Sequence, residues 1–531
     1  MKRTPKKRPP ILEGPFDLAV IGGGINGTAI ARDAALRGKT VILLEKGDFA
    51  SGTSSRSSKM LHGGIRYLEQ LRIGLVYQAL RERRLLLRLV PHLARKQAFV
   101  IPIYQGGRRG PRMIRLGLLL YDLLALGKRL GKSCFLSSQE VVARVPNLLK
   151  DGLLGGGVYY DAVMDDARIC LLNAIAAHDE GQGERGYVTP RNYSEVLEVR
   201  PGSPSTVFIL DKVTGQRASL LAHRVVRALG PWTDPELLVR SKGVHLVLPP
   251  FPMSDGILFS HSKDGRVFFL IPWLQKTVLG TTETAFSGPL EKVRVEPEEV
   301  KYLLDEVQRL FPEIHIGARH ILGTFAGVRP LAKSHGPFAS RAAASVSRAH
   351  RIVDDGNGVL SVFGGKFTTY RLVAKEVVDR LFPGSACETH LRPLPGGEGG
   401  SWEAFQKTLE AEASRFGLPE LERLFYRYGS RLRDVLELIQ EDPSLGERLD
   451  PGYPELRAEV VYSAQHEFAF YPEDFLARRT LLRYSEDGGR AAYDTVESLL
   501  RAHAAAVPLD LAGAREKYFA ELDWEDRLRG K

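Results

Sequence analysis

Residues 16–38 read FDLAVIGGGINGTAIARDAALRG, and the architecture of the first part of the chain follows from them. The apolar run 16–21 is typical of a buried parallel strand, and residues 25–37 have the pattern of a helix. A second apolar run, TVILLE, occupies residues 40–45. A strand, a glycine turn, a helix and a second strand in this order predict a βαβ unit.

The glycine turn of this unit has the G-x-G-x-x-G spacing of a dinucleotide site. Gly22 permits the tight turn, Gly24 lets the backbone approach a pyrophosphate, and Gly27 allows the helix to pack on the strand. The helix N-terminus offers N–H groups to the phosphates. Glu45 ends the second strand, where an acidic residue accepts hydrogen bonds from a ribose diol. We therefore predict a bound dinucleotide.

A hydroxyl-rich loop follows the unit. Residues 51–59 read SGTSSRSSK, and residues 61–67 read LHGGIRY. A solvated serine loop is one interpretation; the other is a loop that wraps a pyrophosphate and a ribityl chain, with glycines next to a flavin ring. Beside the glycine turn we favour the second, which makes the dinucleotide FAD rather than NAD. The loop adds these candidate FAD contacts: Thr53, Ser54, Ser58, His62, Gly63 and Gly64.

The remaining patterns predict an α/β fold followed by a helical domain. Strand patterns occur at 207–210, 225–228, 244–248 and 267–271, and helical patterns at 67–90, 296–311 and 372–381. The Gly- and Pro-rich segment 392–401 is the clearest linker. We expect a composite α/β part up to about residue 394. A helical domain should cover residues 402–531 at the C-terminal end. Residues 1–14 at the N-terminal end should form a basic, disordered tail.

Composition limits the class of protein. The chain has 531 residues, 44% of them hydrophobic, and a formal net charge of +11. These values exclude a disulfide scaffold, a collagen-like repeat and a disordered chain. The three cysteines, Cys134, Cys170 and Cys387, are far apart and lack metal-ligand spacing, so we expect no disulfide framework, no metal site and a reducing compartment. No signal peptide or apolar run of membrane-spanning length is visible.

Several motifs, in order, resemble those of FAD-dependent glycerol-3-phosphate dehydrogenase. They are VIGGGINGTAIARDAALRG (20–38), TSSRSSKMLHGGIRYLE (53–69), LGPWTD (229–234), KGVHLVLP (242–249), FFLIPW (268–273), LGTTE (279–283), GVRPL (327–331) and SVFGGKFTTYR (361–371). The similarity runs from about residue 15 to 375, and a weaker one covers the C-terminal domain, including Tyr428 and Arg478.

The resemblance implies a D-amino-acid-oxidase-like flavoprotein. A Rossmann-like FAD-binding domain over 15–394 should be interleaved with an antiparallel-sheet substrate domain, mainly at 90–160 and 235–345. It implies oxidation of sn-glycerol 3-phosphate to dihydroxyacetone phosphate, with electrons passed to a membrane quinone. It also implies a role in glycerol metabolism at the inner face of the cell membrane. A homodimer is left open.

The substrate is a phosphate dianion, which a planar guanidinium can bind with two hydrogen bonds at once. Arginines in or near the matching motifs make the candidate set Arg66, Arg266, Arg329 and Arg348. By resemblance, Arg329 and Arg348 are the expected phosphate clamp. Arg341 is the rival of Arg348, because the spacing from Arg329 departs from the family's pattern.

The oxidation requires a base for the substrate hydroxyl, and histidine is the usual base near neutral pH. By resemblance His245 is that base, and His62 is the alternative. Lys366 follows Gly365 and could stabilise negative charge on the flavin; otherwise it is a capping lysine. Gly230 belongs to a segment that lies beside FAD in the family.

Residues 108–132 contain a short apolar core between cationic ends. This pattern fits an interfacial helix on an anionic membrane surface, and equally a buried helix with charged ends. Two other functions remain open within the fold: an oxidase that uses O₂, and a flavoenzyme for another hydroxy acid or an amine. Nucleic-acid binding is disfavoured, because the basic residues form no stripe with interleaved aromatics.

Overall fold

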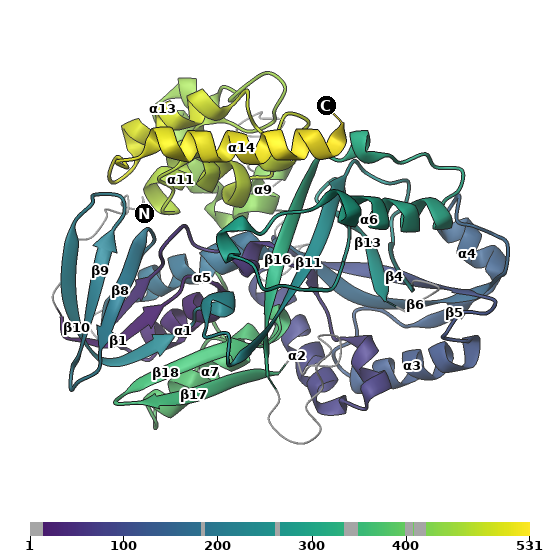
Figure 1. Cartoon of the computed structure of the whole chain (residues 1–531), viewed down its shortest axis with the longest axis horizontal. Coiled ribbons are helices and arrows are strands. Elements are labelled where there is room, and N and C mark those ends of the chain that lie inside the picture. Colours follow the sequence, from purple (N-terminus) through teal and green to yellow (C-terminus); the bar gives the residue numbers. More distant parts are fainter. Residues whose placement is uncertain are drawn as a thin grey trace.

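The computed structural model describes residues 14–181, 186–260, 266–333, 349–398 and 421–530, together with Lys407. Two β-sheets lie side by side, and helices from the end of the chain cover one edge of both (Figure 1). The expected α/β fold with a helical C-terminal part is confirmed. The predicted tail at 1–14 lies outside the described residues except for Gly14.

The first sheet contains the predicted βαβ unit. It runs in the order β17-β18-β10-β1-β2-β7, with β9 next to β10 and β8 next to β9. The pairs β18/β10, β10/β1, β1/β2 and β2/β7 are parallel. Its strands are β1 (Phe16–Ile21), β2 (Val41–Leu44), β7 (Val188–Arg191), β8 (Ser194–Arg200), β9 (Ser205–Asp211), β10 (Arg217–Arg227), β17 (His350–Gly356) and β18 (Val359–Gly364).

Helices cover the parallel strands, which is why these strands are apolar throughout. α1 (Ile25–Leu36) packs between α5 (Asp166–Glu180) and α7 (Tyr370–Leu381). The buried face of α1 consists largely of alanines, including Ala31 and Ala34, so the three helices approach closely. The core they share with β1 and β2 fixes the position of the glycine turn at the start of α1.

The second sheet is antiparallel apart from the β4/β12 pair. It runs in the order β15-β11-β14-β13-β12-β4-β6-β3, with β16 next to β11 and β5 next to β6. Its strands are β3 (Met60–Leu61), β4 (Ala94–Tyr104), β5 (Cys134–Leu136), β6 (Leu153–Met164), β11 (Leu238–Leu248), β12 (Gly256–Ser260), β13 (Val267–Trp273), β14 (Lys276–Gly280), β15 (Thr284–Ala285) and β16 (Gly323–Ala332).

Helices also pack against the second sheet. α6 (Pro297–Leu310) buries its apolar face in the core of this sheet, while α2 (Ile73–Leu89) and α3 (Pro111–Leu124) pack in a separate cluster. α4 (Ser138–Arg144) lies against β6. The helix expected at 67–90 begins later, at Ile73, after a 3₁₀ helix at Ile65–Gln70. Leu71 has a left-handed backbone, φ 54°, which separates the two helices.

The chain passes repeatedly from one sheet to the other. The second sheet takes its strands from 60–164 and 238–332, between segments that belong to the first sheet. The substrate-part boundaries at 90–160 and 235–345 stay a prediction. The two sheets meet where β16 contacts β18, so loops of the first sheet face strands of the second.

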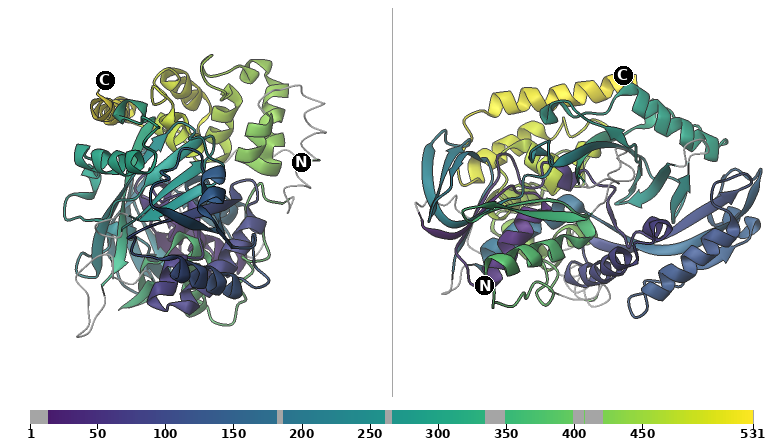
Figure 2. Two further views of the ribbon diagram at one scale, coloured as in Figure 1. Left: turned by 90° about the vertical axis from the view of Figure 1, so that its right-hand side faces the viewer. Right: turned by 60° about the horizontal axis from the view of Figure 1, so that its bottom comes forward.

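The C-terminal part of the described chain is helical and lies across both sheets (Figure 2). Its helices are α9 (Leu421–Tyr428), α10 (Leu432–Glu441), α11 (Arg457–His466), α12 (Pro472–Asp474), α13 (Tyr493–His503) and α14 (Leu511–Arg529). The predicted linker, residues 392–401, is packed against the protein where it is described, up to residue 398. Leu394 is fully buried and donates its N–H to Leu89 O at 2.9 Å. Glycines there allow close backbone contact: a Cβ on Gly397 would lie 2.3 Å from Leu89 O.

Candidate active site

The glycine turn between β1 and α1 is built so that only glycine fits at two of its positions. Gly22 has φ 111°, and a Cβ there would lie 2.4 Å from Ala228 O. A Cβ on Gly27 would lie 1.8 Å from Gly22 O, so this glycine lets α1 begin directly on the turn. The turn thereby places the N-terminus of α1 at the end of β1.

The first turn of α1 can receive an anion. Gly24 caps the helix without a side-chain hydrogen bond, and no acidic residue lies in the first turn. Among the described residues, the nearest atom to a Cβ on Gly24 would be Ser54 Oγ, at 3.2 Å. Ser54 also accepts a hydrogen bond from Ile25 N at 2.9 Å. The helix dipole and the N–H groups at the start of α1 favour a phosphate here.

Glu45 lies just after β2 with its carboxylate held by the backbone. It accepts hydrogen bonds from Gly23 N at 2.6 Å and from Gly47 N at 2.8 Å. Desolvation raises the pKa of the Glu45 carboxyl, and the two N–H donors oppose that rise. A carboxylate has about four lone-pair positions, so it can still accept hydrogens from a ribose diol. The turn, the helix end and Glu45 together fit a dinucleotide such as FAD.

The hydroxyl-rich loop joins this turn to the second sheet. Thr53 Oγ1 donates to Val328 O of β16 at 2.7 Å. Ser58 Oγ lies 2.8 Å from His245 Nε2 on β11. Both were predicted as FAD contacts, and both have protein partners in the structure. A hydroxyl has two acceptor positions besides its donor, so these contacts leave room for a further one.

His245 is a buried, neutral histidine. It is 2% exposed and stacks on Phe325, with 4.8 Å between the ring centroids. Among the described residues no hydrogen-bond partner meets its Nδ1. Burial, then the positive charges of Arg329 and Lys59, hold the pKa of His245 well below its usual range. The imidazole is therefore a proton acceptor at neutral pH.

Arg329 lies on β16, which pairs with the strand that carries His245. Its guanidinium donates to Thr281 Oγ1 at 2.9 Å and to Thr282 O at 3.4 Å. It lies over Gly243, two residues before His245, where a Cβ would be 2.3 Å from Nη2. Glycine at 243 thus makes room for the arginine, and the two strands bring a cation and a base together.

Lys366 lies next to Tyr67 and Gly64. It precedes the 3₁₀ turn Phe367–Thr369, and its Nζ lies 3.8 Å above the Tyr67 ring. A Cβ on Gly64 would lie 3.2 Å from that nitrogen. His62 N donates to Thr368 Oγ1 at 3.2 Å. The structure thus brings His62, Gly64 and Lys366 together, as a flavin-side turn would require.

A buried network that the sequence did not suggest holds Gly63. Gly63 N donates to Asp161 Oδ1 at 3.0 Å and to Tyr121 Oη at 3.1 Å. Tyr121 donates to the same carboxylate at 2.7 Å, and Arg83 Nη1 lies 2.5 Å from it. The only signal in the sequence is a set of polar residues inside apolar patterns. The network ties α2, α3 and β6 to the backbone of the turn.

The other predicted site residues are exposed arginines, turn glycines or residues outside the described chain. Arg66 is exposed on the 3₁₀ helix Ile65–Gln70, and Arg266 is exposed just before β13. Arg341 and Arg348 lie outside the described residues. Gly230 has φ 55°, and among the described residues no heavy atom lies within 4 Å of a Cβ added there. Gly365 has φ 86°. Among the described candidate arginines, the structure places Arg329 beside the histidine.

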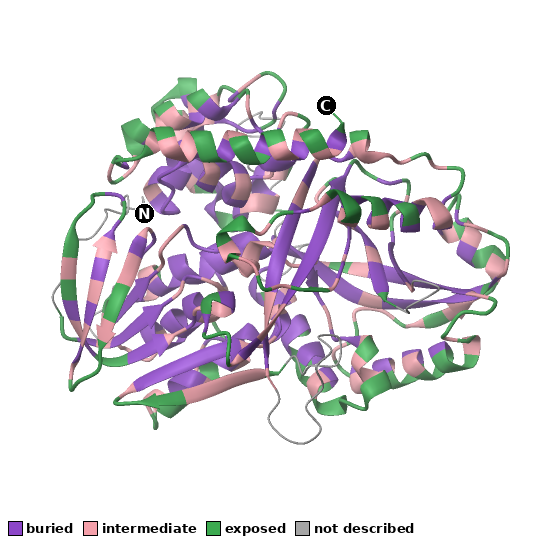
Figure 3. Ribbon diagram, viewed as in Figure 1, coloured by how far each residue is buried: buried purple, intermediate pink, exposed green. Residues whose placement is uncertain are grey.

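α3 has an apolar outer face. Figure 3 shows this helix largely exposed or half-buried, although residues 108–132 could equally have formed a buried helix. Large apolar side chains that are exposed on α3 or just after it are Met113, Leu116, Leu119, Leu120, Leu123 and Leu126. Leu71 and Ile73, just before and at the start of α2, are exposed as well. Within the described chain, no helix is both long and apolar enough to cross a bilayer.

Comparisons with known proteins agree with this geometry. A family model described as FAD dependent oxidoreductase matches residues 17–380, and one described as the C-terminal domain of alpha-glycerophosphate oxidase matches 387–505. A glycerol-3-phosphate dehydrogenase of Synechocystis sp. is 35% identical over 89% of this chain and 90% of that protein.

Two further relatives extend the comparison. An aerobic glycerol-3-phosphate dehydrogenase of Staphylococcus aureus is 34% identical over 88% of this chain and 86% of that protein. A crystal structure of the glycerol-3-phosphate dehydrogenase from Bacillus halodurans, complexed with FAD, superposes with a TM-score of 0.77 at 27% identity. That superposition covers 97% of this chain and 95% of the other.

Proposed function

The chain belongs to the FAD-dependent glycerol-3-phosphate dehydrogenase family, and we propose that it oxidises sn-glycerol 3-phosphate to dihydroxyacetone phosphate and passes the electrons to a membrane quinone. The observation that carries the proposal is the pair of His245 and Arg329 on adjacent strands. A base beside a phosphate-binding cation suits a substrate that has both a hydroxyl and a phosphate.

The substrate's phosphate is held by arginine. Arg329 has its guanidinium fixed by Thr281 and Thr282, so little side-chain freedom is lost on binding. We propose Arg329 as the central contact, with Arg66, Arg266 and Arg348 as further substrate contacts. A planar guanidinium binds two phosphate oxygens at once, which favours this substrate over an amine.

The proton of the substrate hydroxyl passes to His245. The lowered pKa of His245 keeps its imidazole ring neutral at pH 7. The hydrogen bond between Ser58 Oγ and His245 Nε2 fixes the orientation of the ring. FAD, when bound, supplies a two-electron acceptor. Lys366 places a positive charge near the Gly63–Gly64 turn, where it can stabilise negative charge that develops during the reaction.

Two features support a quinone at an anionic membrane surface as the acceptor. A cleft of about 150 Å³ lies between the 3₁₀ helix Ile65–Gln70 and α3, lined by residues such as Ile65, Leu68 and Met113. The exposed apolar side chains of α3 continue this lining, and the chain has a net charge of +11. An apolar face with cationic flanks binds the interface of anionic lipid, here the inner face of the cell membrane.

Anaerobic addition of sn-glycerol 3-phosphate to the purified holoenzyme tests the proposal. We expect the flavin absorbance band at about 450 nm to bleach, whereas glycerol, which lacks the phosphate, should leave the band unchanged. A soluble quinone analogue should then restore the band much faster than air. Fast recovery in air would instead indicate an oxidase. A band that persists with this substrate but bleaches with another hydroxy acid or an amine would overturn the substrate assignment.

A further inference from the structure

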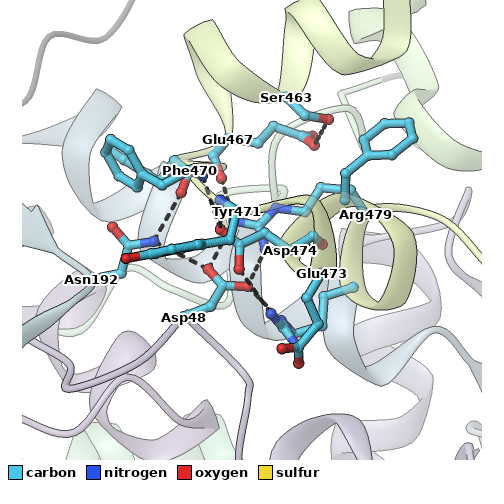
Figure 4. Close-up of polar contacts among 12 residues, drawn as sticks. Asp48, Asn192, Ser463, Glu467, Phe470, Tyr471, Glu473, Asp474 and Arg479 are labelled. Carbon is cyan, nitrogen blue, oxygen red and sulfur yellow. Dashed lines mark hydrogen bonds and ion pairs between the residues drawn. The ribbon is translucent and has the colours of Figure 1, made fainter. Parts of the chain in front are cut away.

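A buried ionic cluster joins the C-terminal helices to the loop that follows β2 (Figure 4). At its centre is Asp48, which is 1% exposed. Arg478 Nε lies 2.5 Å from its Oδ2, and Arg479 donates to both carboxylate oxygens, with Nη2 at 3.0 Å from Oδ1. Asn192 Nδ2 donates to Oδ1 at 3.1 Å. We refer to Asp48, Arg478 and Arg479 as the Asp48 clamp.

The clamp acts on the same loop that presents Glu45. This loop, residues 45–50, is short, and backbone hydrogen bonds hold both of its ends. Ser194 N donates to Glu45 O at 2.7 Å, and Ala50 N donates to Gly23 O at 3.1 Å. Phe49 is fully buried, and its ring lies 5.6 Å from that of Phe468 in the C-terminal part. A shift of Asp48 therefore shifts the Glu45 carboxylate and the glycine turn to which it is bonded.

Burial makes the arginines indispensable to Asp48. Desolvation alone would raise the pKa of the Asp48 carboxyl, but the charges of Arg479 and Arg478 outweigh it and hold the pKa below its usual value. Breaking a buried ion pair by removing one partner leaves an uncompensated charge, which is strongly unfavourable. The loop can therefore keep this conformation only while the C-terminal arginines are in place.

The arginines are in turn fixed within the C-terminal part. Arg478 Nη2 donates to Asp474 Oδ1 at 2.8 Å, and Arg479 Nη2 donates to Glu467 O at 2.6 Å. Tyr193 Oη, from the first-sheet side, donates to Asp474 Oδ1 at 2.5 Å. The Asp48 clamp thus connects the loop after β2 to the C-terminal helical part, and hydrogen bonds hold its residues in both.

We propose that the C-terminal helical part completes the FAD site, with Asp48 as a positioning residue for the adenosine end of the cofactor. Arg478 and Arg479 fix Asp48, and Asp48 fixes the loop that carries Glu45. This role goes beyond the proposed reaction: it concerns how tightly FAD is held and does not depend on the substrate or on the acceptor.

FAD affinity of the apoproteins tests the role. Asp48→Asn and Arg479→Gln should each weaken FAD binding about tenfold or more, measured by quenching of flavin fluorescence and by the rate of FAD release. At saturating FAD, the KM for sn-glycerol 3-phosphate should be unchanged. Since both changes break the same contact, the double variant should bind FAD no more weakly than the weaker single variant.

Arg431→Gln is the matched control. Arg431 is itself buried and also forms an ion pair across the same boundary, 2.6 Å from the exposed Asp179, but within the described chain no hydrogen bond or ion pair joins it to residues 45–50. Its apoprotein should bind FAD like the wild type. Arg479→Lys keeps the charge without the fork and should fall between wild type and Arg479→Gln; circular dichroism and melting of each apoprotein establish that it is folded. FAD binding by Asp48→Asn and Arg479→Gln that matches the control would overturn the proposal.

Discussion

The reactivity of His245 depends on the residues around it rather than on the imidazole alone. Burial and the charges of Arg329 and Lys59 lower its pKa, so the ring is neutral over a wider pH range than a free histidine. A base must be unprotonated to act, and so the acid limb of the pH–rate profile should lie well below pH 6.5. In the proposed reaction Arg329 therefore has two effects: it attracts the substrate's phosphate and it helps to keep His245 neutral.

Arg329→Gln separates these two effects. Loss of the guanidinium should lower kcat/KM for sn-glycerol 3-phosphate roughly 30-fold, on the order of 2 kcal/mol for a hydrogen bond to a charged group. Loss of its positive charge should also move the acid limb to higher pH. Steady-state kinetics between pH 5 and 8 measure both. Arg266→Gln is the comparison, because Arg266 is not among the charges that act on His245, and its acid limb should stay in place.

A parallel fall in kcat/KM at all pH values, with no movement of the acid limb, would contradict the electrostatic role. In that case Arg329 would bind the phosphate without tuning the base. Movement of the limb in Arg266→Gln as well would point to a general change in surface charge.

The two faces of α3 have different surroundings. Its inner face places Tyr121 in the network that holds Gly63, and its outer face exposes a row of leucines. An exposed apolar face of this extent is unusual for a surface helix and indicates an interaction site. The helix is thus the element that connects the proposed membrane surface with the flavin-side turn.

Leu119→Glu tests the outer face. Leu119 is 66% exposed, so a carboxylate there should not disturb the core. It should weaken binding to vesicles that contain anionic lipid about tenfold or more, because an apolar contact is lost and a repelled charge is gained. Sedimentation with vesicles measures this. Leu391→Glu, at a leucine that is 63% exposed elsewhere, should bind vesicles like the wild type. Equal loss in both variants would argue against α3 as the contact.

At the level of elements, local patterns were predictable and distant contacts were not. The β1–α1–β2 unit follows from an apolar run, a glycine turn and a helical repeat that are adjacent in sequence. The pairing of Ser58 with His245 joins residues 187 positions apart. No periodicity encodes such a contact, so the sequence predicted Ser58 as an FAD contact without indicating His245 as its partner. The helix at 67–90 was placed too early, because a left-handed residue such as Leu71 leaves no signal when it is not glycine.

His92 lies where the parts of the molecule meet. It is 2% exposed, and within the described chain neither ring nitrogen has a hydrogen-bond partner. Gly396 of the packed 392–398 segment lies against its ring, with an added Cβ 3.0 Å from Cε1. Burial, then the charges of Arg168, Arg431 and Arg95, lowers the pKa of His92 to about 3. The folded protein thus resists protonation of this residue.

Acid should therefore destabilise the whole molecule through His92. The unfolded chain gains a proton near pH 6.5, whereas the folded chain gains it only near pH 3. The contribution of His92 to the free energy of unfolding is fully present above pH 6.5 and is lost as the pH falls toward 3. The loss is about 5 kcal/mol, at about 1.4 kcal/mol per pKa unit. His92→Gln should flatten the fall in melting temperature between pH 7 and pH 4.5. His223→Gln, at an exposed histidine, should not; equal acid slopes for wild type and His92→Gln would contradict the assignment.

The Asp48 clamp also imposes an order on biosynthesis. Asp48 and Arg479 are 431 positions apart, so the ribosome makes the carboxylate long before its counter-ions. At about 5–20 residues per second, this delay lasts roughly 20 to 90 s. During that interval the nascent βαβ unit carries an uncompensated aspartate where the loop must close. The loop at residues 45–50 can thus reach its final conformation only when translation is almost finished. Polypeptides that end before residue 478 would bind FAD weakly.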